Sequence, residues 1–258
     1  MNNALWITAA LLSGACVIGW WRQCRTRNAS HADVIWSFGV GAAALFYCVM
    51  GDGDSIARII TALMIGFWSL RLGWHIHHRI SGAEEDGRYQ AMRSALGDKI
   101  NQFHFFFFQA QGLLAWLFAL PAWVIATETR AVPAGFLVAG AAVGIAALAG
   151  EALADKQLAN FRAMPDSKGK TCREGLWRYS RHPNYFFEWL HWFSYPLLAY
   201  GAEHAIWLWL APAFMFLFLW FVTGIPYTER QALKSRGEDY KRYQRETSMF
   251  FPWWPKTK

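Results

Sequence analysis

The sequence predicts an all-α integral membrane protein, a bundle of seven transmembrane helices that forms a single domain over residues 1–258. Three observations lead to this prediction. Hydrophobic residues make up 55% of the chain and charged residues 17%, against about 25% charged residues in an ordinary soluble domain. Seven apolar stretches approach the length that a helix needs to cross a membrane. The basic residues gather on alternate connections between those stretches.

Each apolar stretch is expected to be a helix, because a segment in lipid must satisfy its own backbone hydrogen bonds and needs about 20 residues to cross. The first stretch has the position of a signal peptide, but it lacks a basic start, and Trp20 and Trp21 stand where small residues would mark cleavage, which favours a retained helix. The sixth is the shortest and contains Glu188 and Pro196. The stretches run approximately over residues 5–21, 34–50, 56–74, 103–126, 132–152, 185–200 and 206–225.

The distribution of basic residues predicts the orientation. The connections after the first, third and fifth stretches and the tail after the seventh contain 22 of the 25 lysines and arginines. The connections on the other side contain only Arg130. Because cytoplasmic loops are enriched in Lys and Arg, we expect an N-terminus outside and a cytoplasmic C-terminus. The long connections 75–102 and 153–184 both lie on the basic side, which predicts a working face there.

Composition excludes several other classes of protein. A disordered chain is excluded by the high apolar content. The four cysteines have no paired spacing, which argues against a disulfide-built scaffold and against a metal site of the CxxC type. The net charge of +7 would suit nucleic acid. Basic loops on one face of a membrane protein account for both that charge and the apolar runs, so we predict no nucleic-acid partner. From the cysteine spacing we predict no metal.

Acidic residues at the predicted spans need an explanation, because ionisable groups there usually face a cavity or a partner. Asp33 opens the second stretch and is either a functional acid or a helix N-cap. Glu151 and Asp155 lie one helical turn apart and form either part of a site or a solvated helix end. Glu188 lies one turn into the sixth stretch, where it faces a cavity or forms an ion pair within the bundle.

Two segments of the first half combine titratable side chains. The run at residues 74–79, Trp-His-Ile-His-His-Arg, ends the third stretch. Only His75 and His78 share a helical face and no carboxylate lies at ligand spacing beside them, so a cationic helix end at the membrane surface is preferred to a metal site. One of the histidines remains a candidate proton donor. The loop at residues 84–89, Glu-Glu-Asp-Gly-Arg-Tyr, is either a solvated turn or a place where Tyr89 meets a ligand.

Residues 175–188 form the densest polar group of the chain. Arg178 and Arg181 lie three residues apart and His182 follows at the start of the sixth stretch. Fixed cations beside backbone N–H groups at a helix start bind anions such as phosphates. Asn184 and Glu188 lie four residues apart, so they share a face and together suit a carboxamide. The alternative is a cluster of basic residues that only marks the cytoplasmic side of the membrane and precedes a helix that begins with proline.

The run at residues 181–185, Arg-His-Pro-Asn-Tyr, together with Glu188, resembles the steroid 5α-reductase C-terminal superfamily. The resemblance is closest to its bacterial branch of uncharacterised membrane proteins, a domain of unknown function of the 1295 type. It extends over nearly the whole chain. The other segments that resemble this branch are 33–36, 68–72, 85–89, 155–157, 161–162 and the tail from 229 to 252.

The resemblance implies a seven-helix oxidoreductase of the bacterial inner membrane. Such proteins bind NADPH in a cytosol-facing cavity among the later helices, here about 103–258, and pass hydride to the activated C=C bond of an enone, typically a steroid. The expected partners are therefore a lipophilic small molecule from the bilayer and membrane lipids. In the resemblance, Asp155, Arg162, Asn184 and Glu188 match positions that contact the cofactor. Together with the basic residues named above for phosphates, the residues expected to bind the cofactor are Arg88, Asp155, Lys156, Arg162, Arg178, Arg181, His182, Asn184, Tyr185, Glu188, Glu229 and Tyr240.

The chain departs from the animal enzymes at the carbonyl end of the substrate. Those enzymes use a Gln-Glu pair in the second helix and a Tyr in the third. Here the second stretch offers only Asp33, and residues 75–78 contain no Tyr. Enone reduction needs an acid that polarises the carbonyl as enolate charge develops. The candidates are Asp33, His75 and Tyr89, with Glu188 expected to orient the nicotinamide.

Two alternatives remain open. Isoprenylcysteine carboxyl methyltransferases share an Arg-His-Pro…Tyr run and a Glu-bearing amphipathic tail, and they bind S-adenosylmethionine in a similar cavity. Seven helices and the Asn184…Glu188 spacing favour the reductase, and S-adenosylmethionine has no phosphate that would require so many cations. The second alternative is a non-enzymatic lipid-binding membrane protein. In either case the aromatic and basic end at residues 250–256 is expected to anchor the tail at the membrane interface.

Overall fold

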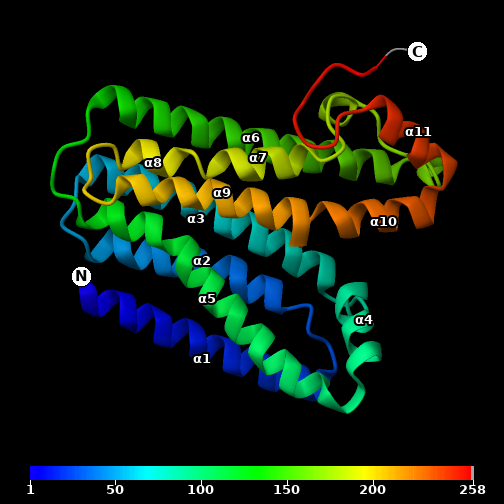
Figure 1. Ribbon diagram of the computed structural model, residues 1–258, viewed down its shortest axis with the longest axis horizontal. Coiled ribbons are helices and arrows are strands. Elements are labelled where there is room, and N and C mark those ends of the chain that lie inside the picture. Colours follow the sequence, from blue (N-terminus) through cyan, green and yellow to red (C-terminus); the bar gives the residue numbers. More distant parts are fainter. Residues whose placement is uncertain (223, 257–258) are drawn as a thin grey trace. The chain divides into compact units, whose positions relative to one another are not determined.

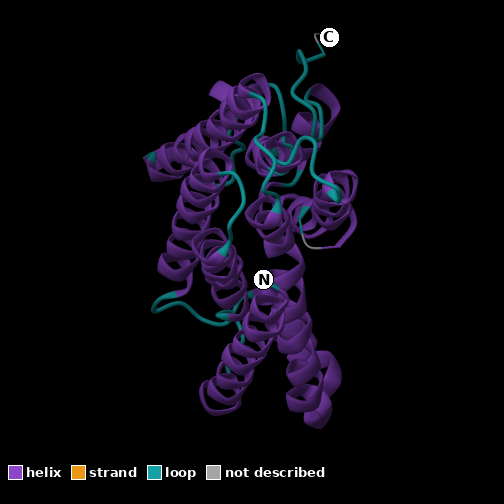
Figure 2. Ribbon diagram, turned by 90° about the vertical axis from the view of Figure 1, so that its left-hand side faces the viewer, coloured by secondary structure: helices purple, strands orange, loops and turns teal. Residues whose placement is uncertain are grey.

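The computed structural model describes residues 1–222 and 224–256 (Figure 1). Within these ranges every regular element is a helix and no strand occurs, as Figure 2 shows. The all-helical prediction is therefore confirmed. The chain divides into two compact units, which are described one at a time. Unit 1 comprises Met1–Pro133 and Leu198–His204, and unit 2 comprises Ala134–Leu197 and Ala205–Lys258.

Unit 1 is built from four long helices and one short one. The long helices have the length and the apolar composition expected of membrane spans. Asp54 caps α3 by accepting a hydrogen bond from the backbone N–H of Ala57 at 2.8 Å. Helix α2 packs against α3 and α5, and α1 packs against α5. The helices are α1 (Asn2–Thr26), α2 (Ala32–Met50), α3 (Ser55–Ile80), α4 (Gly87–Leu96) and α5 (Ile100–Thr127), with a 3₁₀ turn at Gly97–Lys99.

Aromatic side chains fill the centre of unit 1. Trp68 of α3 is fully buried, and the ring of Trp36 from α2 meets it edge-on at 5.7 Å. Trp36 also meets Phe118 of α5 edge-on at 5.9 Å. Edge-to-face pairs of this kind stabilise beyond the area that they bury. The three helices are therefore joined through one chain of aromatic contacts.

Unit 2 contains one long helix and several shorter elements. Helix α6 packs against α7, and Gly150 makes this approach close, since a Cβ at that position would lie 2.4 Å from the ring of Phe187. The elements are α6 (Ala134–Ala163), two 3₁₀ turns (Pro165–Ser167 and Gly175–Arg178), α7 (Pro183–His191), α8 (Ser194–Leu198), a 3₁₀ turn at Ala205–Trp209, α9 (Leu210–Leu217), a π-helical turn at Phe218–Val222, α10 (Ile225–Arg236) and α11 (Glu238–Glu246).

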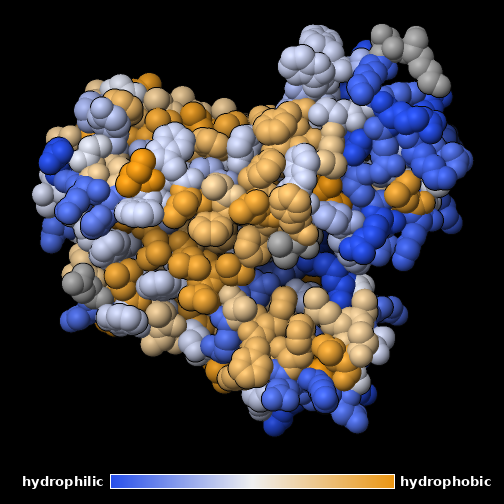
Figure 3. Space-filling view, in the orientation of Figure 1, coloured by the Kyte–Doolittle hydropathy of each residue, from blue (hydrophilic) through white to orange (hydrophobic). Residues whose placement is uncertain are grey.

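In the described part of the chain, six helical segments are long and apolar enough to cross a membrane. Many large apolar side chains on them are exposed, for example Leu63 at 69% and Ile206 at 70%. In Figure 3 hydrophobic surface covers the shorter helices of unit 2, while polar surface gathers at α10 and α11. A soluble protein rarely exposes so much apolar surface. The six segments, Asn3–Thr26, Ala32–Met50, Ser55–Ile80, Gly87–Thr127, Ala134–Ala163 and Ala205–Arg236, indicate an integral membrane protein.

The predicted stretch at residues 185–200 is not one of the six. It is divided into α7, which has nine residues, and α8, which has five. Pro196 has no N–H group to continue the ladder of hydrogen bonds. The hydroxyl of Ser194 donates to the carbonyl oxygen of His191 at 2.6 Å, which satisfies the end of α7. At 1.5 Å per residue neither helix alone reaches across a hydrocarbon core of about 30 Å.

Candidate functional site

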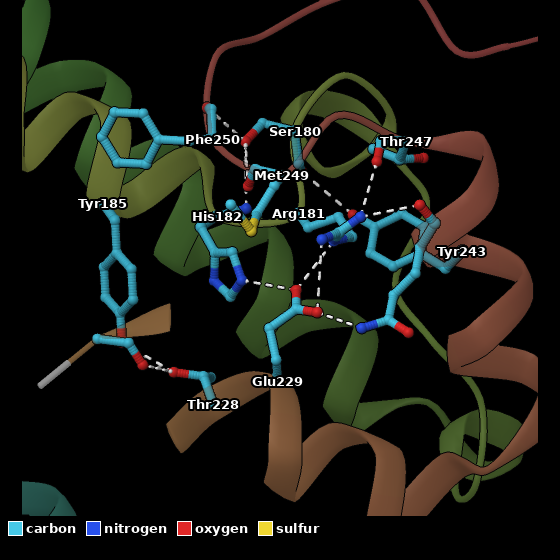
Figure 4. Close-up of polar contacts among 12 residues, drawn as sticks. Ser180, Arg181, His182, Tyr185, Thr228, Glu229, Tyr243, Thr247, Met249 and Phe250 are labelled. Atoms are coloured by element: carbon cyan, nitrogen blue, oxygen red, sulfur yellow. Dashed lines mark hydrogen bonds and ion pairs between the residues drawn. The ribbon is translucent and has the colours of Figure 1, made fainter. Parts of the chain in front are cut away.

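The centre of the polar region in unit 2 is the carboxylate of Glu229, on α10. Arg181 donates to it from Nε at 2.9 Å and from Nη2 at 3.4 Å. Nε2 of His182 lies 3.0 Å from the same carboxylate, and the hydroxyl of Tyr240 donates to it at 2.8 Å. Gln244 also donates to it through Nε2. We call these five residues the Glu229 cluster, of which Figure 4 labels Arg181, His182 and Glu229. Four side chains thus satisfy one buried acid.

The remaining donors of Arg181 bind the tail. Nη1 donates to the carbonyl oxygens of Gln244 at 2.9 Å and Thr247 at 3.1 Å. The backbone N–H of Arg181 donates to the carbonyl oxygen of Ser248 at 2.8 Å, and the hydroxyl of Ser180 donates to that of Phe250 at 2.8 Å (Figure 4). The guanidinium is only 10% exposed. Arg181 therefore fastens the C-terminal segment to the start of α7.

The environment of the Glu229 cluster sets its protonation. Burial lowers the pKa of His182 below its usual 6.5 and outweighs the opposing effect of its hydrogen bond to Glu229, so the imidazole is neutral near pH 7. Burial and the nearby Glu229 carboxylate raise the pKa of Tyr240, whose proton stays on the phenol. The cluster is a fully satisfied network rather than a set of groups poised to react. Its geometry suits positioning of the neighbouring chain.

A second group of predicted residues meets where α6 packs on α7. The side-chain amide of Asn184 donates to Asp155 at 3.3 Å. One turn further along α7, Glu188 is buried and its Oε1 accepts a hydrogen bond from the indole N–H of Trp192 at 3.2 Å. We call Asp155, Asn184 and Glu188 the amide–acid group. The i,i+4 spacing on α7 thus places an amide and a carboxylate on the helix face next to α6.

The predicted cations of unit 2 differ in how they are used. Lys156 on α6 and Arg178 in the turn before α7 are exposed, and within the described chain neither side chain has a hydrogen-bond or ion-pair partner. Arg162 is exposed in the last turn of α6. The ring of Tyr185 stacks on His182 with centroids 5.4 Å apart, and its hydroxyl lies 3.4 Å from that of Thr228 (Figure 4). Lys156 and Arg178 are the cations left available to a ligand.

In unit 1, three predicted residues are brought together. Nη2 of Arg88 donates to Asp33 at 2.7 Å, and the hydroxyl of Tyr89 donates to the other oxygen of Asp33 at 2.9 Å. Nε of Arg88 donates to Asp86 at 3.1 Å. We call Asp33, Asp86, Arg88 and Tyr89 the Asp33 cluster. Asp33 is therefore not the N-cap of α2. The cap residue is His31, and its side chain makes no capping hydrogen bond. His75, the third acid candidate, is exposed near the end of α3.

The Asp33 cluster also fixes the loop before α4. Burial opposes ionisation of Asp86, but hydrogen bonds from Arg88 outweigh it and lower the pKa of that carboxyl. Beside it, Arg93 forms an ion pair with Glu85 at 2.8 Å. The phenol of Tyr89 is fully buried with its proton directed to Asp33. As a donor to a substrate carbonyl, Tyr89 would first have to leave Asp33.

Comparison with known proteins places this arrangement in a family. Residues 19–247 match the family described as "Protein of unknown function (DUF1295)". The chain belongs to the DUF1295 family. A protein of the fission yeast Schizosaccharomyces pombe, described as uncharacterized protein C594.04c, is 27% identical over 260 residues, which cover 90% of this chain and 75% of the relative. The family match agrees with the domain of unknown function of the 1295 type that the resemblance indicated, and neither finding carries an assigned activity.

This DUF1295 protein also uses residues that the sequence analysis missed. Gln244 and Thr247 complete the surroundings of Arg181 and Glu229, and the hydroxyl of Tyr243 donates to the carbonyl oxygens of Trp177 and Ser180. Tyr240, Tyr243 and Gln244 follow a spacing of three and four residues, so they share one face of the amphipathic helix α11. That periodicity was the available signal, but it does not reveal what the face packs against.

Proposed function

We propose that this DUF1295 protein is a membrane oxidoreductase that reduces the activated C=C bond of a lipophilic, steroid-like enone with NADPH. The observation that carries the proposal is the amide–acid group, in which Asn184 and Asp155 meet at 3.3 Å with buried Glu188 one turn away. An amide and a carboxylate side by side offer both a donor and an acceptor to the carboxamide of a nicotinamide. The resemblance to 5α-reductases supports the same assignment.

The residues near this group fit the rest of the cofactor. Lys156 and Arg178 have no partner within the described chain and suit a pyrophosphate. The Glu229 cluster holds the chain at residues 180–182 in place, so we assign positioning roles to Arg181 and His182. When bound, NADPH supplies the hydride. Asn184 and Glu188 then orient the nicotinamide, and burial of Glu188 keeps water from that end of the site.

The acid for the substrate carbonyl remains a proposal with three candidates. Asp33 and Tyr89 belong to one hydrogen-bonded cluster, while His75 is exposed. Of these, we favour Asp33 with Tyr89 as a unit, because Arg88 holds the carboxylate at 2.7 Å and the phenol is the only neutral O–H donor of the three residues. A shift of Tyr89 from Asp33 to a carbonyl would deliver that hydrogen bond.

A panel assay tests the proposal. Purified protein is given NADPH with steroid, quinone and fatty-acyl enones, and NADPH oxidation is followed by absorbance. We expect turnover with at least one enone and a loss of about 100-fold or more in Glu188→Gln, because misorientation of the reacting group costs rate steeply. The control is Glu174→Gln, which changes an exposed carboxylate of the same unit and should keep the wild-type rate. Wild-type rates in Glu188→Gln would remove Glu188 from the site.

One observation favours a second candidate, an S-adenosylmethionine-dependent methyltransferase. Arg181 and His182 direct their side chains into the Glu229 cluster, which leaves fewer cations for phosphates than the sequence suggested. Asp155 and Glu188 are carboxylates, and carboxylates attract the positive sulfonium of S-adenosylmethionine. A ligand that carries no phosphate would suit a site with few available cations and two carboxylates. The melting temperature of the purified protein, measured with NADPH and with S-adenosylmethionine, separates the two candidates.

We also propose seven crossings, with the N-terminus outside and the cofactor site facing the cytoplasm of a bacterial inner membrane. Helices α7 and α8 would form the additional crossing as a broken pair, with Pro196 near the break. The support is the asymmetry of lysine and arginine, 22 of which fall on one side in this arrangement. Fluorescent-protein fusions at residue 258 and at 129 test it. Fluorescence at 258 only is expected, and fluorescence at both positions would contradict an odd number of crossings between residues 129 and 258.

A further inference from the structure

Unit 1 contains a cavity of about 620 Å³ at the end of its helices where basic residues gather. Its size lies within the range of small-molecule sites, about 300–1,000 Å³. The cavity is formed by the last turns of α1, the start of α2 and the end of α3 with the loop that follows. It is lined by Ala15, Ile18, Gly19, Arg22, Thr26, Asn28, His31, Val34, Ile35, His77, Ile80, Ser81, Gly82 and Ala83.

The lining of this cavity separates into two walls. Ala15 and Ile18 on α1 and Val34 and Ile35 near the start of α2 contribute aliphatic surface, and Ile80 adds to it at the end of α3. Arg22, Asn28 and His77 contribute polar groups toward the helix ends. None of the lining residues is acidic. The cavity therefore matches a molecule with an apolar chain and an anionic head, arranged along the membrane normal.

Two polar side chains of the lining have donors to spare. The guanidinium of Arg22 makes no hydrogen bond or ion pair with any described residue. Asn28 accepts a hydrogen bond from the backbone N–H of Ser30 at 3.0 Å, and its amide N–H groups bind no described residue. His31 differs, because its Nε2 lies 2.9 Å from the carbonyl oxygen of Gly19 and burial lowers its pKa. His31 is thus a neutral wall residue, and Arg22 is the available charge.

The acids nearest to the cavity in sequence do not cancel this charge. Asp33, between the lining residues His31 and Val34, forms an ion pair with Arg88 at 2.7 Å. Asp86 also pairs with Arg88, at 3.1 Å, and Glu85 pairs with Arg93 at 2.8 Å. Glu84 is exposed. The surroundings add further cations, since Arg25 and Arg27 follow Arg22 and Arg79 follows His77 and His78. A cluster of basic residues directly beyond the apolar part of a helix is typical of sites for anionic lipids.

We propose that this cavity is a binding site for an anionic phospholipid, with its phosphate at Arg22 and Asn28 and one acyl chain along the aliphatic wall. The phosphate lies at the depth where α1 changes from apolar to basic, which is where lipid headgroups reside. Arg22 and Asn28 offer two separate donors, and a phospholipid has ester and headgroup oxygens beside its phosphate that can accept from both, which favours a phospholipid over a free fatty acid. The site does not depend on the proposed cofactor chemistry.

Native mass spectrometry of the full-length protein in a neutral detergent tests this inference. Dioleoyl phosphatidylglycerol, dioleoyl phosphatidylcholine and oleate are titrated separately. We expect phosphatidylglycerol to bind at least about tenfold more tightly than phosphatidylcholine, because the choline cation of phosphatidylcholine cancels the charge of its phosphate and is repelled by the basic residues around the cavity. Equal binding of the two phospholipids would overturn the proposal, and preferential binding of oleate would overturn the assignment to a phospholipid.

Two variants locate the site. Arg22→Gln should weaken phosphatidylglycerol binding about tenfold. Its matched control is Arg25→Gln, which removes the same charge from a side chain that lies 4.1 Å over the ring of Trp21 and does not line the cavity. Arg25→Gln should change the affinity less than about twofold. Equal effects of the two variants would indicate general surface attraction and contradict a built site.

A steric variant tests the apolar wall without touching charge. Ala15 is exposed on α1 and lines the cavity, so Ala15→Phe fills space without disturbing packed side chains. We expect it to reduce phosphatidylglycerol binding to the phosphatidylcholine level while the melting temperature of the lipid-free protein stays that of the wild type. Unchanged phosphatidylglycerol affinity in Ala15→Phe would overturn the placement of the acyl chain.

Discussion

Single residues explain why the Arg-His-Pro-Asn run of the chain is built as it is. The run presents two kinds of side chain to two different surroundings. Arg181 and His182 bind the Glu229 carboxylate, whereas Asn184 two residues later faces Asp155 on α6. The proline between them starts α7, because its fixed φ and missing N–H suit the first turn of a helix. One short run therefore both fastens the tail and supplies a polar group to the candidate site.

The first prediction concerns the pair of Arg181 and Glu229, whose side chains are 10% and 12% exposed. Arg181→Gln should lower the free energy of unfolding by about 3 kcal/mol or more, because it leaves a buried carboxylate without its charged partner. Thermal unfolding in detergent, followed by a thiol-reactive dye or by circular dichroism, measures the loss. Arg178→Gln is the control, since it changes an exposed arginine three residues earlier and should shift stability by less than about 0.5 kcal/mol.

A double-mutant cycle makes this prediction specific. Arg181→Gln combined with Glu229→Gln should cost clearly less than the sum of the single changes, with a coupling of about 1 kcal/mol or more. Additive losses would show that the two side chains stabilise the protein separately, contrary to the bidentate contact between them.

At the residue scale, the sequence was a better guide to which side chains make important contacts than to the partners of those side chains. Asp33, Arg88 and Tyr89 were named for separate reasons, and the structure joins them at 2.7 Å and 2.9 Å. Arg181 was expected at a phosphate and instead binds the tail. Sequence position alone cannot supply that contact, because Gln244 and Thr247 lie more than 60 residues away along the chain. Contacts of such separation are set by packing rather than by a local pattern.

At the scale of elements, the long helices follow directly from apolar length, and the broken one follows from local chemistry. The spans near residues 5–21, 34–50, 56–74 and 103–126 each lie within one helix of the structure, and α6 contains all of 132–152 except its first two residues. The stretch at 185–200 has enough apolar residues but is interrupted between His191 and Ser194. Counting apolar residues cannot detect this interruption, whereas Pro196 and the capping hydroxyl of Ser194 explain it.

The second prediction concerns the turn between α2 and α3, which lies against the end of α5. The backbone N–H of Gly53 donates to the carbonyl oxygen of Ala126 at 2.9 Å, and a Cβ on Gly53 would lie 2.4 Å from the carbonyl oxygen of Ile125. Backbone atoms cannot turn aside as a flexible side chain can. Gly53→Ala should therefore lower the free energy of unfolding by about 1–3 kcal/mol, as measured by thermal unfolding in detergent.

Gly14 provides the matched control for this substitution. It lies in the middle of α1, and nothing is within 4 Å of the place where its Cβ would stand. Gly14→Ala should leave stability unchanged or raise it by about 0.5–1 kcal/mol, because alanine favours the helix. Equal responses at the two glycines would contradict the close approach of the turn to α5.

At the scale of the whole molecule, composition was sufficient to predict the class of protein. An aromatic and apolar chain with few charges cannot cover its surface with polar groups, and the large exposed side chains on the helices are the direct result. The division into two units was not predicted, since all stretches have similar composition and no linker separates them. The candidate site residues lie at the polar ends of helices, where basic residues that set the topology and residues of a site have the same composition.

The central claim is that the amide–acid group binds NADPH, and the melting temperature of the detergent-purified protein tests it most directly. A ligand at a hundredfold excess over its Kd stabilises the folded state by about 2.7 kcal/mol, which for a chain of this size raises the melting temperature by about 5 °C or more. We predict this rise with NADPH, its loss in Asn184→Ala, and no rise with S-adenosylmethionine. A rise with S-adenosylmethionine and none with NADPH would contradict the account.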